Sequence, residues 1–214
     1  VPPHNLGELC EAVVFMAKRW AKRAAVTVDN LLQFIQGPDF PTGGLAFRYR
    51  ENGGDTPDDI IRQMYETGQG RLIMQARVDI ESLGGGKHNV VVSELPYMVQ
   101  KSTIMERIGT EVRNGRIEGV SDVRDESDHE GMRLVIETSR GHDPNTVLEG
   151  LLQYSQLRET FGAQILALVP TEDGMRPQYL SLRDALGYFI EHRLQVIERR
   201  SRHEREKLRK RLHI

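Results

Sequence analysis

The chain has 214 residues, of which 38% are hydrophobic and 28% are charged, a balance typical of a globular protein and unlike that of a disordered or fibrous one. A single cysteine, Cys10, excludes a disulfide framework and a cysteine-based zinc site. No apolar run approaches the roughly 20 residues that a membrane-spanning helix needs, and no secretory signal is recognisable. We therefore expect a soluble, cytoplasmic protein.

Charge is unevenly distributed along the chain. The formal net charge is only −2, yet residues 181–214 hold ten Lys or Arg against five Asp or Glu, a net of +5. The preceding 180 residues therefore carry a net of −7. A solvated helical face explains such a basic tail, and so does a helix that faces a partner or a nucleic acid.

The N-terminal part is predicted to be an extended arm followed by helices. Residues 1–7 cannot open as a helix, because Pro2 and Pro3 remove two backbone donors. Apolar residues recur at helical spacing over residues 8–25, and Thr27 is placed to cap a second helix over residues 28–35. Two segments rich in Gly and Pro are predicted to be irregular loops: residues 37–44 and 51–57.

Residues 71–81 alternate between apolar and polar side chains, which predicts a half-buried strand. A loose connection over residues 82–87 leads to a return strand over residues 89–95. The triple glycine at residues 84–86 permits a phosphate cradle or a plain hairpin. We favour the hairpin, because no helix and no Lys-Ser/Thr pair follows to complete a P-loop.

The middle of the chain predicts alternating strands and helices. Thr103 and Glu106 form a capping box for a helix to Asn114, and Asp143 with Pro144 begins another helix, to about residue 153. The predicted strands cover residues 117–124, 132–138 and 165–169. This order is the split β-α-β arrangement, so we predict an antiparallel or mixed sheet with helices on one face, class α+β.

The last predicted element is a helix of about 33 residues. Ser181 and Asp184 form a capping box, and neither Pro nor any Gly after Gly187 interrupts the stretch to Ile214. Such a helix projects beyond a compact domain. Its apolar seam predicts the first arm of a coiled coil whose partner helix lies outside these residues.

No self-contained active site is recognisable. The acidic turn over residues 125–130 offers oxygen ligands for a divalent cation, but Glu130 stands where an EF-hand loop needs Gly, so we favour a hairpin turn. The seven histidines are scattered, and no nucleophile elbow or dinucleotide fingerprint is present. The sequence predicts no metal site and no catalytic residue.

Six motifs resemble, in order, those of the A subunit of bacterial type IIA DNA topoisomerases, the gyrase A and topoisomerase IV A family. They span nearly the whole chain, and the resemblance identifies a fragment that contains the tower domain and the start of a coiled coil. The motifs are Val1-Pro2-Pro3-His4-Asn5-Leu6, residues 37–44, residues 65–70, Glu94-Leu95-Pro96-Tyr97, residues 117–133, and Phe189-Ile190-Glu191-His192-Arg193 with Arg199-Arg200.

The resemblance implies the function of a larger enzyme. The family cleaves both DNA strands through a tyrosine ester, passes a second duplex and reseals the break, with ATP and Mg²⁺ used by the partner B subunit. Its nucleophilic tyrosine lies upstream of the Pro-Pro segment, so this chain is expected to hold no cofactor and to be inactive alone. Arg48-Tyr49-Arg50 superficially matches an arginine–tyrosine pair but stands at the wrong place in the family order.

The resemblance also implies DNA contacts. The family places an isoleucine before Pro-Pro that wedges between base pairs, and Val1, followed by Pro2, stands there in this chain. Arg71, Arg77 and Lys101 are the candidates for phosphate contacts, with solvated surface charge as the alternative for each.

The predicted division is an N-terminal arm with helices (1–44), a tower-like α+β domain (45–180) and a coiled-coil helix (181–214). The expected partners are double-stranded DNA, the B subunit of the enzyme and, in the full-length protein, a second copy of the A subunit, with no membrane. A second interpretation of the sequence is a stand-alone α+β scaffold module that assembles through its basic C-terminal helix.

Overall fold

The structure is a computed structural model that describes residues 1–51, 57–129, 131–172 and 174–212. Most of the predicted loop at 51–57, Glu130 of the acidic turn, and the last two residues of the predicted C-terminal helix lie outside the described residues. The fold is of the α+β class, as the sequence predicts. None of the described helices is both long and apolar enough to cross a membrane.

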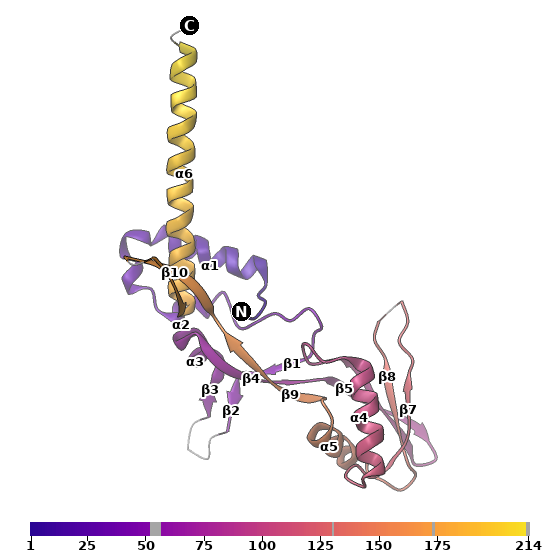
Figure 1. Ribbon diagram of the computed structural model, residues 1–214. Helices are drawn as coiled ribbons and strands as arrows, with labels where there is room; N and C mark the ends of the chain where they lie inside the picture. Colours follow the sequence, from indigo (N-terminus) through magenta and orange to yellow (C-terminus); the bar gives the residue numbers. More distant parts are fainter. Residues whose placement is uncertain (52–56, 130, 173, 213–214) are drawn as a thin grey trace. The chain divides into compact units, whose positions relative to one another are not determined.

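Groups of helices and groups of strands follow one another along the chain (Figure 1). The helices are α1 (Leu6–Lys18), the 3₁₀ helix η1 (Trp20–Ala25), α2 (Val28–Leu31), α3 (Ile60–Thr67), α4 (Lys101–Arg113), α5 (Pro144–Tyr154) and α6 (Leu182–Leu212). The strands are β1 (Leu45–Phe47), β2 (Tyr49–Arg50), β3 (Asp58–Asp59), β4 (Gln69–Gln75), β5 (Arg77–Gly84), β6 (Lys87–Glu94), β7 (Val120–Asp125), β8 (Leu134–Thr138), β9 (Arg158–Gln164), β10 (Leu166–Thr171) and β11 (Gly174–Tyr179).

The chain forms two compact units. Unit 1 contains Val1–Pro38, Ile61–Gly70 and Ala163–Ile214, and unit 2 contains Asp39–Ile60 and Arg71–Gly162. The chain passes between the units within β4 and again within β9. Because each unit is assembled from separate stretches, they do not test the continuous segments 1–44, 45–180 and 181–214, which stay a prediction.

Unit 2 is built on a four-stranded antiparallel sheet with the strand order β5-β6-β8-β7. Strands β6 and β7 are joined through α4, and β8 lies between them, which is the predicted split β-α-β arrangement. The predicted strand over residues 165–169 does not join this sheet. It forms part of β10, which pairs with β11 in a separate hairpin, while β5 occupies the sheet edge beside β6.

One face of this sheet packs against α4 and α5 (Figure 1). Alternate residues of β6 and β8 point to these helices, and Ile104 and Ile108 of α4 meet Val147 and Leu151 of α5 in the same core. Each such fully buried aliphatic side chain contributes about 1.5–3 kcal/mol through the apolar surface it removes from water. The core consists of Ala76, Val90, Val92, Leu95, Ile104, Ile108, Ile117, Leu134, Ile136, Val147, Leu151 and Leu157.

The predicted strand over residues 71–81 is two strands. The neighbouring strands to which this segment is hydrogen-bonded change at Ala76, which lies between β4 and β5. Ala76 donates its backbone N–H to the carbonyl of Leu157 at 2.7 Å. β4 then belongs to the three-stranded sheet β1-β4-β9, and β5 to the four-stranded sheet. Alternation continues through the break because Leu72, Met74 and Ala76 are inaccessible to solvent and Val78 of β5, at the next alternate position, is partly buried against the core.

Helix caps follow local chemistry where short polar residues precede the helix. The Asn5, Thr27 and Asp143 side chains each accept a backbone N–H of the first turn that follows. The capping box predicted at Thr103 and Glu106 is wrong, because α4 begins two residues earlier, at Lys101, after Gln100, whose side chain makes no capping bond. The single helix predicted over residues 8–25 is in fact two elements, α1 and η1.

In unit 1, the chain around Gly68 is held by three hydrogen-bonded segments. The carbonyl of Gly68 accepts from Ile165 at 2.7 Å, and the carbonyl of Ile165 accepts from Leu180 at 2.9 Å. Gly68 has a φ of 77°, and a Cβ there would collide with the Leu180 carbonyl oxygen. Only glycine fits at position 68, beside the Leu180 carbonyl, without strain.

Helix α6 begins as expected: Asp184 donates its backbone N–H to Ser181 Oγ at 3.1 Å, and its carboxylate accepts the Ser181 hydroxyl at 2.6 Å. The helix has 31 residues, and its first turns pack on α1 and α2. Its buried residues end at Ile190, after which most of the apolar side chains are exposed. The exposed ones are Leu194, Ile197, Leu208 and Leu212.

We expect Leu151→Ala in α5 to lower the free energy of unfolding by about 2–5 kcal/mol, because Leu151 is fully buried and its loss leaves a cavity. Chemical denaturation monitored by circular dichroism measures this change. Leu83→Ala is the matched control, since 55% of the Leu83 side chain is exposed at a hairpin tip. Equal effects of the two substitutions would contradict the position of the core.

Candidate nucleic-acid interface

The five predicted DNA-contacting residues fall in both units. Val1 and Pro2 belong to unit 1, whereas Arg71, Arg77 and Lys101 belong to unit 2. Each group is therefore described within its own unit.

The N-terminal arm presents one side chain and buries the next. Val1 is 79% exposed, although it is a branched apolar residue, and Pro2 is buried. Asn5 then caps α1 by accepting the backbone N–H of Gly7 at 2.9 Å. The arm thus has a fixed base and an exposed apolar tip at Val1.

His4 ties this arm to α3. Its Nδ1 lies 2.9 Å from the carbonyl oxygen of Pro2, and its Nε2 lies 2.8 Å from the hydroxyl of Tyr65. Tyr65 is completely buried, and burial raises its hydroxyl pKa. Burial also lowers the pKa of the His4 imidazole, which favours the neutral ring. These contacts form a link between the arm and the core of unit 1 that the sequence analysis did not predict.

An apolar groove of about 500 Å³ lies between the arm, α1 and α6. Its lining is almost entirely hydrophobic, and several of its side chains are half or more exposed, among them Leu6, Val14 and Phe189. The lining residues are Val1, His4, Leu6, Leu9, Cys10, Val13, Val14, Ile165, Leu182, Ala185, Leu186 and Phe189. The groove has no cluster of polar groups for catalysis.

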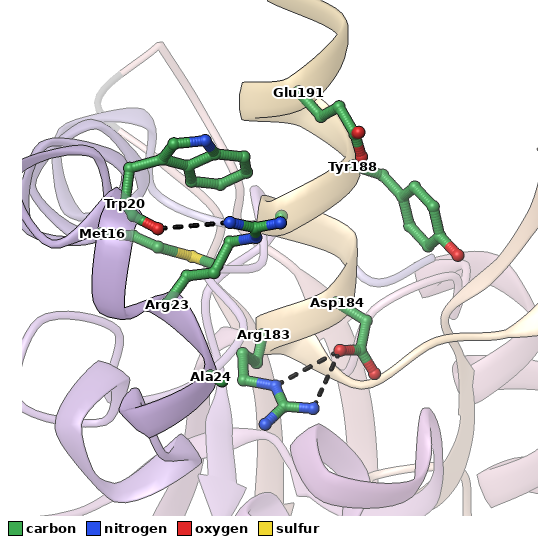
Figure 2. A pocket seen from close by; sticks show the side chains of 9 residues that line it. Met16, Trp20, Arg23, Ala24, Arg183, Asp184, Tyr188 and Glu191 are labelled. Carbon is green, nitrogen blue, oxygen red and sulfur yellow. Dashed lines mark hydrogen bonds and ion pairs between the residues drawn. The ribbon is translucent and has the colours of Figure 1, made fainter.

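A second pocket in unit 1, of about 360 Å³, contains two arginines (Figure 2). The guanidinium of Arg23 lies over the Trp20 ring, 4.6 Å from its centroid, and donates to the Trp20 carbonyl at 3.4 Å. Arg183 donates two hydrogen bonds of 3.2 Å to Asp184. Each guanidinium already has a partner within the protein, so the pocket is not a preformed phosphate site.

In unit 2, Arg71 is the candidate whose charge has no partner. It lies on β4, directly before the buried Leu72, and is exposed. Its guanidinium makes no ion pair or side-chain hydrogen bond with any residue that the structure describes. A phosphate could therefore approach Arg71 without displacing an internal partner.

Arg77 and Lys101 are instead paired with acidic residues. Arg77 Nε lies 3.2 Å from the carboxylate of Glu94. Lys101 Nζ lies 2.6 Å from Asp125 and donates to Ser127 Oγ at 3.0 Å. These bonds lower the Asp125 pKa to about 2, with Lys101 as the largest cause. A phosphate must compete with a carboxylate for either side chain.

Ion pairs also cover the sheet face opposite α4 and α5. Because Val90 and Ile136 face the helices, their neighbours Asn89 and Glu137 face away. Lys87 lowers the pKa of Glu137, and Glu81 raises that of Arg133. The pairs join Lys87 to Glu137, Arg124 to Glu126 and Glu137, and Arg133 to Glu81 and Glu126.

The acidic turn joins β7 to β8 as a hairpin connection, and its carboxylates at Asp125 and Glu126 are ion-paired. Among the residues that the structure describes, no group of three or more His, Cys, Asp or Glu could hold a metal ion. Tyr49 is 56% exposed on β2, and the adjacent Arg48 pairs with Asp59 at 2.8 Å.

A family model for the A subunit of DNA gyrase/topoisomerase IV matches residues 1–214. The chain belongs to this family. It is 42% identical over 214 residues to the DNA gyrase A subunit of Granulibacter bethesdensis and 39% identical over 214 residues to that of Kosmotoga olearia. It is 37% identical over 214 residues to the DNA topoisomerase 4 A subunit of Streptococcus pyogenes serotype M18.

These matches cover the whole of this chain but only 21% to 24% of each relative. The chain thus spans about a quarter of the length of the family members it matches. Both gyrase and topoisomerase 4 proteins are among them, at similar identities. Membership of the family is therefore established at the level of the A subunit, without a choice between these two enzymes.

We expect Lys101→Met to raise the pKa of Asp125 from about 2 toward its ordinary value near 4, but not completely, because the bonds from Ser127 remain. The folded pKa lies below the unfolded one, so this contribution stabilises the fold above about pH 4 and is lost as the pH falls toward 2. NMR titration of the carboxylates measures the pKa of Asp125. Lys87→Met, which removes a distant lysine paired with Glu137, should leave Asp125 unchanged.

Proposed function

We propose that these residues are the part of a type IIA topoisomerase A subunit that supports and bends the DNA segment to be cleaved. The observation that carries the proposal is the exposed Val1 side chain on an arm whose next residue, Pro2, is buried. Family membership supplies the context of a DNA breakage-reunion subunit.

Val1 acts as a wedge between base pairs in this proposal. Unstacking a base step costs a few kcal/mol, and an apolar side chain that fills the gap recovers part of that cost. The side chain must be held rigidly to do so, because a mobile arm would lose conformational entropy on insertion. Two prolines and the contacts of His4 provide this rigidity.

Arg71 is the first phosphate contact in the proposal, since its charge has no internal partner among the described residues. Arg77 and Lys101 contribute less, because each must exchange a carboxylate for a phosphate. The acidic residues around them keep the affinity of the isolated chain low and strongly dependent on salt.

The chemistry of strand cleavage is assigned to other parts of the enzyme. We place the nucleophilic tyrosine in a winged-helix domain upstream of Val1, and the use of ATP and Mg²⁺ in the partner B subunit. Residues 1–214 then need no cofactor and do not cleave DNA alone. Tyr49 is not the nucleophile in this proposal, because Arg48 beside it is engaged by Asp59.

Helix α6 is proposed as the first arm of a coiled coil in a tower-containing A subunit that dimerises when complete. Its exposed apolar residues Leu194, Ile197 and Leu208 lie beyond the last buried position, Ile190. Two i,i+4 ion pairs, Arg200–Glu204 and Glu198–Arg202, stabilise this stretch. A partner helix that covers these residues would remove them from water.

We expect Val1→Ala in the intact A subunit, together with its B subunit, to reduce the bend and the cleavage complex several-fold. Alanine lacks two methyl groups of the wedge, a loss on the order of 1 kcal/mol. Energy transfer across an end-labelled duplex measures the bend, and thermal melting measures the fold. Val14→Ala is the control, because Val14 is a half-exposed valine of α1 in the same unit. An unchanged bend would show that Val1 is no wedge.

We expect Arg71→Ala to reduce the slope of log Kobs against log salt concentration for duplex binding by about 0.9, the loss of one phosphate contact. Fluorescence anisotropy at several salt concentrations measures the slope. Arg140→Ala is a matched control that removes another exposed arginine of unit 2. The same slope change in both variants would indicate a general charge effect instead of a contact at Arg71.

A further inference from the structure

The two hydrogen bonds of His4 determine which nitrogen of its ring carries the proton. The Pro2 carbonyl can only accept a hydrogen bond, so the Nδ1 atom of His4, 2.9 Å away, carries the proton. In the neutral ring Nε2 is then an acceptor, and the Tyr65 hydroxyl donates to it across 2.8 Å. The two rings lie with their centroids 5.7 Å apart. Neutral His4 therefore satisfies both hydrogen bonds and also gives the Tyr65 hydroxyl proton an acceptor.

Protonation of His4 breaks this arrangement. Imidazolium Nε2 carries a proton and can only donate to the Tyr65 oxygen, so the proton of this buried hydroxyl has no acceptor among the described residues. A buried donor without an acceptor is costly, and the cation also loses hydration. Protonation therefore favours release of His4 from Tyr65.

Release of His4 also frees the arm. The bond from His4 to the Pro2 carbonyl closes a turn of three residues, so the imidazole holds the peptide group that directly follows Pro2. Pro2 itself is buried, and Val1 is the residue beyond it. The direction of the Val1 side chain thus depends on the link from Pro2 through His4 to Tyr65.

We propose that His4 is a positioning residue that, held by Tyr65, directs Val1 toward the DNA and releases it when His4 is protonated. The proposal rests on the assignment of Val1 as the wedge. It makes DNA bending by the enzyme sensitive to pH through a residue that does not itself contact DNA.

The charged group that acts on this pair comes from α1. The carboxylate of Glu8 in the first turn of α1 opposes ionisation of Tyr65, and burial opposes protonation of His4. From α3, the group that faces His4 is Tyr65 itself. The order of the arm therefore weakens as the pH falls below the ordinary histidine pKa of about 6.5.

The test uses the intact A subunit with its B subunit, and measures the bend of end-labelled duplex between pH 8 and pH 5.5. The wild-type bend should fall with pH. His4→Phe removes both hydrogen bonds, so it should lower the bent fraction by at least about fivefold at pH 8, the factor expected for one net hydrogen bond, and remove the pH dependence. His4→Asn, whose amide can donate to Pro2 but lacks the nitrogen that meets Tyr65, should show a reduced bend that does not change with pH. Tyr65→Phe, which removes the hydroxyl that holds His4, should likewise lower the bent fraction at pH 8.

Hydrogen–deuterium exchange of the peptide that covers residues 1–7, measured without DNA, tests the link separately from the wedge. His4→Phe should increase this exchange, and Val1→Ala should not. Wild-type exchange of the arm in His4→Phe, or a wild-type pH profile in His4→Asn, would overturn the proposal. If instead Val1→Ala bends DNA normally while His4→Phe loosens the arm, the link stands and the assignment of the wedge fails.

Discussion

The pairing of β6 with β8 determines which side chains of unit 2 are buried. Val90 lies opposite Ile136 and Val92 opposite Leu134, and all four face the helices α4 and α5. A shift of one residue would turn these four side chains away from the helices and bring the charged Glu137 into the core. The register is therefore fixed by the difference between the two faces, and the position of Lys101 follows from the helix α4 that packs on this sheet.

The face opposite the helices explains how an acidic unit accommodates its basic residues. Arg124 contacts three carboxylates and Arg133 two, and Lys87 pairs with Glu137. Such exposed pairs contribute little stability individually. Their effect is instead to leave few unpaired cations at the surface, so that attraction to phosphate is local and not a property of the whole unit.

The sequence predicts elements well where one physical rule dominates. The hairpin connection over residues 82–87 predicts the return strand β6, and Asp143 followed by Pro144 predicts the start of α5, which the structure confirms. The sequence analysis does not predict strand β11, because Pro177 lies within it. The proline is tolerated there because the two-stranded hairpin leaves both of its edges open. The break at Ala76 escapes because it depends on a hydrogen bond to Leu157, far away in the sequence.

The candidate site shows the same limit of prediction. The exposure of Val1 agrees with a Pro-stiffened arm, but the burial of Pro2 and the contact of His4 with Tyr65 depend on residues 61 positions apart. The pairing of Arg77 with Glu94 and of Lys101 with Asp125 likewise joins separate elements. Sequence identifies which residues carry charge, and only the fold determines whether that charge is already neutralised.

The length of α6 beyond its packed base gives the helix a mechanical property. Its last buried residue is Ile190, and the helix continues to Leu212 without a proline or glycine. These 22 residues form a stiff rod of about 33 Å, so a tilt of about 10° at its base would displace its tip by about 6 Å. Small rearrangements of the side chains around Leu182 and Leu186 are therefore amplified with distance along the rod. The packing at the base of α6 therefore determines the direction of the whole exposed part of the helix.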